Sequence, residues 1–120
     1  MPRLIAAPSD IIAAGNIPKK ILEFIGRLNT KTAGVSIALM KSPSGWSEQG
    51  QTPEFDEYSL VLEGALKVET KKETIEARAG QCVEVNLGEW VKYSTPGPLG
   101  AQYVSVCVPA FSPETVHRDK

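Results

Sequence analysis

The stretch from Gly45 to Gly64 carries most of the side chains that could do chemistry. It is a polar, acidic loop that runs directly into the apolar segment Tyr58 to Leu62. Glu57 immediately precedes that segment, so a rigid strand would hold its carboxylate in a fixed place. A buried carboxyl has a raised pKa, which suits proton transfer near neutral pH. Glu57 is therefore the candidate general base, and a structural hydrogen-bonding role is the alternative.

Other side chains near Glu57 could bind a ligand. The amide of Gln51 both donates and accepts hydrogen bonds, and strand alternation puts Ser59 on the face of Glu57. Alternation over 101–108 groups Tyr103 with a hydroxyl and a thiol on one face, which could line a polar pocket unless Tyr103 points to solvent. Trp46 stands at the entry of the loop.

The acidic loop could instead hold a hard cation such as Ca²⁺ or Mg²⁺ through carboxylate oxygens. His117 is the only histidine, and it either lies exposed in the tail or reaches the acidic loop when the tail folds back. We expect no cofactor. The alternative is a divalent cation held by Glu48, Gln51, Glu54, Glu57 and His117.

Composition limits the partners. The 120 residues suit one domain, and 13 Lys+Arg against 14 Asp+Glu leave a net charge of -1. Without a basic patch we expect no nucleic-acid partner, and without a long apolar run we expect neither a membrane span nor a signal peptide. A soluble, cytoplasmic protein is the expectation.

The pattern of the chain is typical of an all-β fold. Residues 1–18 predict an arm with at most one helical turn, capped by Ser9 or Asp10. Residues 19–110 predict the barrel and 111–120 a tail or short helix beginning after Ser112. The expected strands are 20–25, 35–40, 58–62, 65–70, 74–77, 81–85, 90–94 and 101–108. A tight hairpin is expected at residues 71–72.

Two further expectations follow from alternation. Cys82 and Cys107 lie in apolar runs, so both are expected to be buried, reduced and slow to react. Tyr58, Leu60 and Leu62 should form an apolar outer face, which predicts a homodimer.

Two glycine-bounded blocks carry a resemblance to a known family. The first is Gly45, five residues, Gln51, one residue, Pro53, three residues, Glu57, six residues, Gly64. The second is Gly80, five residues, Asn86, one residue, Gly88, two residues, Val91, three residues, Thr95, after a spacer of 15 residues. Both resemble the motifs of small single-domain cupins, in particular a histidine-poor group without a known activity, with a looser likeness to ethanolamine-utilisation cupins. The resemblance implies a double-stranded β-helix, or jelly roll.

The resemblance also implies where a metal would bind. In metal-dependent cupins the two blocks supply three histidines and a glutamate, and those positions here are Gln51, Pro53, Glu57 and Val91. Proline and valine have no side-chain donor, so a histidine-type transition-metal site is not expected. Tyr93 shares the face of Val91 and becomes a further pocket candidate.

The sequence leaves three functions open. The preferred interpretation is a cupin that binds a small polar organic ligand inside the barrel without a histidine-bound metal. The second is an isomerase-, epimerase- or lyase-like enzyme with Glu57 as general base, and the third is a non-catalytic assembly module. A cavity that contains Glu57 would favour the first two over the third.

Overall fold

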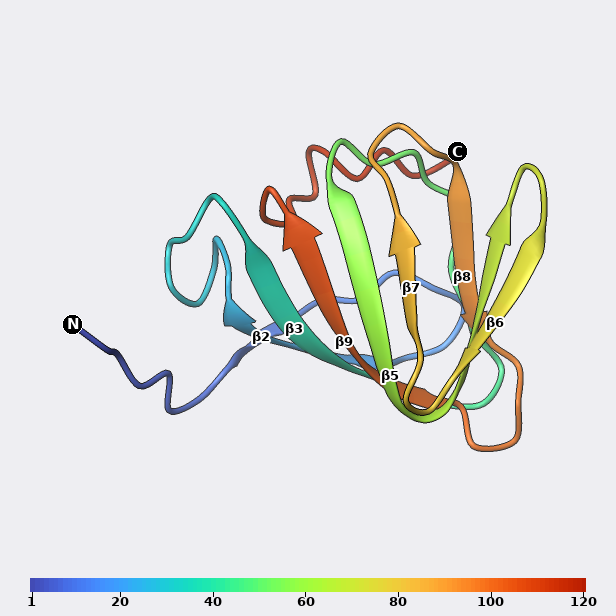
Figure 1. The fold of residues 1–120 in the computed structure, drawn as a ribbon, viewed down its shortest axis with the longest axis horizontal. Helices are drawn as coiled ribbons and strands as arrows, with labels where there is room; N and C mark the ends of the chain where they lie inside the picture. The colour runs from blue at the N-terminus through green and yellow to red at the C-terminus, as the bar shows by residue number, and fades with distance from the viewer.

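The chain folds into a curled β-sheet that forms an open barrel (Figure 1). The computed structural model describes all 120 residues and contains nine strands and no helix. The strands are β1 (Ser9–Ile11), β2 (Lys20–Ile25), β3 (Ser36–Ser42), β4 (Trp46–Ser47), β5 (Asp56–Thr70), β6 (Thr74–Arg78), β7 (Cys82–Val85), β8 (Val91–Thr95) and β9 (Ala101–Val108). Since it has no helix, the chain contains none long and apolar enough to cross a membrane.

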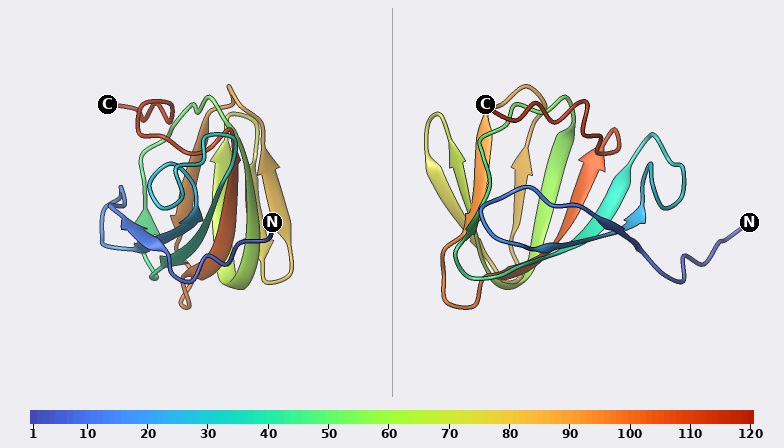
Figure 2. Two further views of the ribbon diagram at one scale, coloured as in Figure 1. Left: turned by 90° about the vertical axis from the view of Figure 1, so that its left-hand side faces the viewer. Right: turned by 180° about the vertical axis from the view of Figure 1, so that it is seen from behind.

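All strand pairs are antiparallel, and the order across the sheet is β1-β2-β3-β9-β5-β8-β4. The central strand β5 also pairs with β6 and β7. Figure 2 shows from behind that the N-terminal segment crosses the open side of the curled sheet. The all-β barrel expected from the sequence is confirmed.

The centre of the fold is the long strand β5, where two separate strands were expected. Its first half pairs with β7 and β9, and its second half pairs with β6 and β8. Gly64 lies between the two halves with a φ of 75°, and a bulge between Val61 and Glu63 precedes it. The glycine therefore bends one continuous strand from one side of the barrel to the other.

Neither of the two helical turns that the sequence allowed is formed. Ser9 and Asp10 lie in β1 and pair with β2. If this segment were a helix, the edge of β2 would remain unpaired. After Ser112 the chain makes a single turn, closed by a hydrogen bond from the Thr115 amide to the Ser112 carbonyl at 3.1 Å. The C-terminal segment is thus a tail.

The tail, residues 111–120, is attached to the acidic loop. Amides of Thr52 and Glu54 donate to tail carbonyls at 3.1 and 2.9 Å, and the Asp119 amide donates to the Gly50 carbonyl at 2.8 Å. Val116 is buried in a small apolar cluster with Phe55. The Trp90 indole N–H also donates to the Asp119 carboxylate at 2.8 Å.

The prediction for the cysteines is half wrong. Cys107 is buried, but Cys82 is exposed. Strand β7 alternates with Val83 and Val85 inward, so Cys82 faces outward with Glu84. The charged residue two positions along was the signal that Cys82 belongs to the outer face.

We expect a thiol reagent to modify one cysteine per folded chain and two per unfolded chain. Burial and the nearby Glu57 carboxylate raise the pKa of the Cys107 thiol, which disfavours the reactive thiolate, whereas Cys82 is open to solvent. Mass spectrometry of chains labelled with and without denaturant measures this. Cys82→Ser should leave no rapid labelling in the folded chain, and rapid labelling of that variant would contradict the assignment.

Candidate functional site

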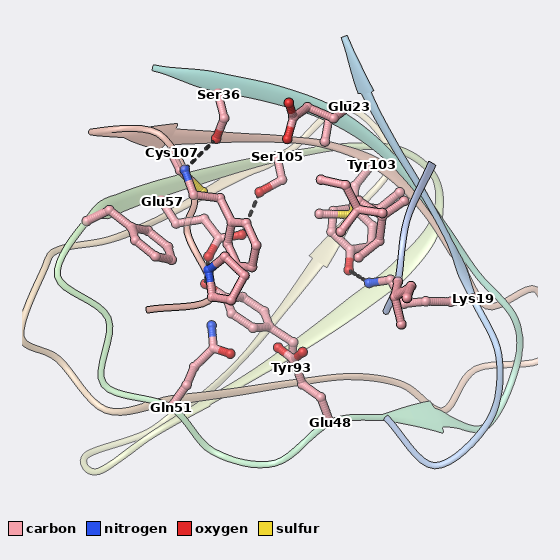
Figure 3. Close-up of a pocket in the computed structure, with 18 of the residues that line it drawn as sticks. Lys19, Glu23, Ser36, Glu48, Gln51, Glu57, Tyr93, Tyr103, Ser105 and Cys107 are labelled. Carbon is pink, nitrogen blue, oxygen red and sulfur yellow. Dashed lines mark hydrogen bonds between the residues drawn. The ribbon is translucent and has the colours of Figure 1, made fainter. Parts of the chain in front are cut away.

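A cavity of about 160 Å³ lies between the sheet and the N-terminal segment (Figure 3). Its lining combines apolar side chains with charged and hydrogen-bonding ones. The apolar side chains include Ile21, Ala38, Met40, Phe55 and Phe111. The polar ones include Lys19, Glu23, Ser36, Glu48, Gln51, Glu57, Tyr93, Tyr103, Ser105 and Arg118.

Glu57 lines this cavity from β5. The Ser105 hydroxyl of the neighbouring strand β9 donates to its Oε2 at 2.5 Å, and the Tyr93 hydroxyl of β8 lies 3.4 Å from its Oε1. Burial raises the pKa of the Glu57 carboxyl above its ordinary value, while these hydrogen bonds and the positive charges of Lys19 and Arg118 oppose the rise. The raised pKa makes this carboxylate a stronger base than an exposed glutamate.

Glu48 and Lys19 are two further ionisable groups of the cavity, and both are half-buried. Burial raises the pKa of Glu48 to about 7, against the attraction of Lys19. Burial also lowers the pKa of Lys19 to about 8, against the attraction of Glu48 and Glu57. Perturbed pKa values in one cavity are typical of functional sites.

Gln51 and Arg118 offer hydrogen-bonding atoms with no partner in the protein. Gln51 is 4% exposed, and its side-chain oxygen is buried without a hydrogen bond. The Nε atom of Arg118 is also buried and unpaired. Unpaired polar atoms are costly inside a protein, so a ligand or water in the cavity would satisfy them.

Strand geometry explains why these side chains converge. Glu57 pairs with Cys107 across β5 and β9, and the inward face of β9 carries Tyr103, Ser105 and Cys107. The aliphatic residues of β9 lie on the other face. The expectation that the polar face of residues 101–108 lines a pocket is confirmed.

The structure corrects the positions of two candidate ligand-binding residues. Trp46 is 1% exposed in the main apolar core, and its indole N–H donates to the Ala14 carbonyl at 3.1 Å. Ser59 is also buried, with an unpaired hydroxyl, but outside the cavity. Ser59 faces inward as alternation predicts, but neither residue lines the cavity.

The alternative five-residue cation site is not assembled. Glu54 and His117 contact each other on the exposed surface, so the tail does bring the histidine to the acidic loop. Glu48, Gln51 and Glu57 instead line the cavity. No group of three or more His, Cys, Asp or Glu side chains is placed to hold a metal ion.

The residues at the cupin metal positions do not fit a transition metal. Pro53 and Val91 are buried and have no side-chain donor atom. The remaining donors, Gln51 and Glu57, share the cavity with two cationic side chains, which oppose a further positive charge. We therefore assign no step at this site to a metal.

Sequence reasoning missed Lys19, Arg118 and the lining role of Glu48. Lys19 follows Pro18 and precedes β2, where alternation puts it on the face of Ile21 and Glu23. That alternation was the available signal for Lys19. Nothing in the sequence placed Arg118 beside residues 67 positions earlier, because its location depends on how the tail packs.

Comparison with known proteins relates part of the chain to a curated protein. No family model matches the sequence. The chain is 42% identical over 101 residues to the endoribonuclease YbeY of Myxococcus xanthus, a match that covers 84% of this chain. The match covers only 34% of the Myxococcus protein, so the chain spans about a third of the length of that relative.

Solved structures identify the fold. The chain resembles the ethanolamine utilization protein Q assigned in Salmonella typhimurium LT2, with a TM-score of 0.66, 18% identity and coverage of 87% of this chain and 97% of that one. The polyketide cyclase RemF of Streptomyces resistomycificus gives a TM-score of 0.75 at 17% identity, covering 100% and 86%. The cupin domain of Schizosaccharomyces pombe Cnp3 gives 0.66 at 11% identity, covering 81% and 69%. These likenesses confirm the fold expected from the two glycine-bounded blocks.

Proposed function

We propose that this cupin-fold chain binds a small organic molecule in the barrel cavity and transfers a proton to or from it through Glu57. The observation that carries the proposal is the position of the Glu57 carboxyl, which lies inside the cavity beside a second carboxyl and an amine. General acid–base catalysis needs such a group within hydrogen-bond reach of the reacting atom. The neighbouring hydroxyls of Ser105 and Tyr93 fix its orientation.

The cavity limits the size and polarity of the ligand. Ligand pockets are typically about 300–1,000 Å³, and a cavity of about 150 Å³ holds a molecule the size of benzene. At about 160 Å³ this cavity suits a single ring or a short branched chain. Apolar side chains such as Met40 and Phe55 would contact the carbon skeleton, and a carbonyl or hydroxyl group would meet Glu57 and Gln51.

We expect ring-sized probes such as cyclohexanone, cyclohexanol and phenol to bind in the cavity. Saturation-transfer NMR measures their contact with the protein, and native mass spectrometry of the freshly purified chain detects any molecule retained from the cell. Ala38→Leu should abolish probe binding, since Ala38 lines the cavity and a larger side chain would occupy it. Glu84→Gln is the matched control, since Glu84 is exposed on the outer face of β7.

Cyclohexanone also tests the proton transfer. Bound beside Glu57 in deuterated water, its α-hydrogens should exchange faster than in free solution, and Glu57→Gln should remove that acceleration. A chain that binds no probe and carries no retained molecule would overturn the proposal. Binding without any acceleration of exchange would leave the non-catalytic binding function and overturn the catalytic role of Glu57.

A ribonuclease function is the competing proposal, supported by the identity with a third of the Myxococcus endoribonuclease. RNA binding draws on cationic side chains that neutralise phosphates, and this chain has a net charge of -1. Its polar cavity also suits a molecule much smaller than a nucleotide. Cleavage of a single-stranded RNA by the purified chain, lost in Glu57→Gln, would favour the nuclease.

We propose that the chain forms a homodimer through the outer face of β5 and β9. Leu60 and Leu62 are 44% and 51% exposed on β5, and Val108 of β9 is 40% exposed. Strand β9 turns its aliphatic side chains outward because its polar side chains line the cavity. The same native mass spectra report the oligomer, and Leu62→Glu should shift a dimer toward a monomer.

A further inference from the structure

Lys19 is a half-buried lysine whose amine has no ion-pair partner. Its Nζ donates to the Tyr103 hydroxyl at 2.8 Å and lies over two aromatic rings, 3.8 Å from the Trp46 centroid and 5.1 Å from the Tyr103 centroid. The two ion pairs of the chain, with N···O distances within 4.0 Å, are Arg78 with Glu76 and His117 with Glu54. A lysine removed from most of the solvent is ordinarily paired with a carboxylate, whereas this amine contacts only a hydroxyl and two aromatic rings.

The environment of Lys19 also increases the share of neutral amine. Burial lowers its pKa to about 8 from an ordinary 10.5, although the charges of Glu48 and Glu57 partly offset this. A few per cent or more of the chains therefore carry the neutral, nucleophilic amine at neutral pH. Nucleophilic lysines in other proteins are activated by desolvation in the same way.

Glu23 also lines the cavity, but unlike Lys19 it is held by hydrogen bonds from the backbone. Glu23 is 2% exposed, but its Oε1 accepts hydrogen bonds from the amides of Leu28 and Asn29, each at 3.0 Å. It therefore holds the turn after β2, and its burial has a structural explanation. The Lys19 amine has one hydroxyl partner and otherwise faces the cavity and aromatic rings (Figure 3).

We propose that Lys19 is a nucleophile that forms an imine with a small aldehyde or ketone bound in the barrel cavity. This rests on the proposed function, because it requires the cavity to hold an organic ligand, and it names the ligand as a carbonyl compound. The apolar side chains of Ile21 and Met40 would contact the carbon skeleton. Glu48 and Glu57 lie at the same cavity as groups that can exchange protons with the carbonyl oxygen.

The reaction balances without a further reactant. The neutral Nζ forms a bond to the carbonyl carbon as the C=O π bond opens, and one amine proton moves to the oxygen to give a carbinolamine. The C–O bond then breaks, the second amine proton joins the departing oxygen, and one water leaves as the C=N bond forms. A carboxylic acid donates to the departing hydroxyl and recovers its proton from nitrogen, so no group is oxidised or reduced.

Reductive trapping tests the proposal. The chain is incubated with cyclohexanone and sodium cyanoborohydride, which reduces an imine to a stable secondary amine, and the product is analysed by intact and peptide mass spectrometry. We expect one cyclohexyl group per chain, located on Lys19. The trapping rate should increase with pH up to about 8 as the amine loses its proton.

The neighbouring residue supplies the control. Lys19→Arg and Lys19→Met should lose the adduct, whereas Lys20→Arg should retain it, since Lys20 is exposed at the start of β2. Glu84→Gln should also retain it. If a variant at position 19 does not fold, the location and pH dependence of the adduct in the unmodified chain still decide the outcome.

Each result separates this inference from the proposed function. Cyclohexanone binding by saturation transfer without an adduct on Lys19 overturns the imine and leaves cavity binding intact. An adduct distributed over exposed lysines, at the same rate in Lys19→Arg, also overturns it. Absence of both binding and adduct, with no retained molecule in native mass spectra, overturns the two proposals together.

Discussion

Gly64→Ala should destabilise the fold by about 4 kcal/mol or more, a large share of the roughly 5–15 kcal/mol typical of a domain. A Cβ at this position would lie 2.1 Å from the Gly100 carbonyl oxygen, where real contacts exceed 3.0 Å. The backbone φ of 75° adds the strain of a left-handed conformation. Relief would require the chain to separate where the Ala65 amide donates to the Gly100 carbonyl at 3.1 Å.

Gly80→Ala provides the matched control for this prediction. Gly80 has a similar φ of 87°, but a Cβ there meets no atom within 4 Å. We expect it to cost about 1–2 kcal/mol, which is the conformational strain alone. Urea unfolding measures the free energy of unfolding of both variants. An equal loss of that free energy in the two variants would show that the contact with Gly100 is not what fixes the bend of β5.

Acidification from pH 8 to pH 5.5 should stabilise the fold, by about 2 kcal/mol from Glu48 alone. Burial raises the pKa of Glu48 from 4.5 to about 7, so the folded state binds a proton more tightly than the unfolded state. The contribution of this carboxyl to the free energy of unfolding therefore increases as the pH falls through 7 toward 4.5. Glu57, whose pKa is also raised by burial, acts in the same direction.

Lys19 has the opposite dependence. Burial lowers its pKa to about 8, so its charged form is disfavoured in the folded state, and stability is gained as the pH rises from 8 toward 10.5. Glu48 and Lys19 together predict a minimum of stability between pH 7 and pH 8.

Urea unfolding at pH 5.5, 7.5 and 10 measures this minimum. Glu48→Gln combined with Glu57→Gln should remove the gain on the acid side, while Glu84→Gln should leave it unchanged. A change of stability between pH 7.5 and pH 5.5 that is identical in the double variant would contradict the burial of ionisable carboxyls in the cavity.

Most of the fold could be predicted from the sequence because strand alternation and turn residues are local signals. Strands β2, β3, β6, β7, β8 and β9 lie where the alternation of side chains indicates. The continuity of β5 could not be predicted, because a glycine that ends a strand and one that bends it have the same local signature. Strand β1 forms only through pairing with β2, so its three residues carry no independent signal.

The candidate site likewise contains residues that local sequence signals could place and residues that they could not. Glu57, Gln51, Tyr93 and Tyr103 could be placed together, because they lie in or next to strands whose inward faces follow from alternation and from the glycine-bounded blocks. Lys19 and Arg118 lie in segments that only tertiary packing brings to the cavity. The sequence therefore predicted Glu57 and the amide and hydroxyl groups of the site, but neither Glu48 nor the cationic side chains.

The tail has a consequence for the kinetics of the site. Phe111 and Arg118 form part of the cavity wall, and the segment that carries them is attached by a few backbone hydrogen bonds and the small cluster around Val116. Detaching such a segment costs much less free energy than opening the barrel sheet. The residence time of a bound molecule should then depend on how often the tail detaches, and Val116→Ala should shorten that time without an equal loss of global stability.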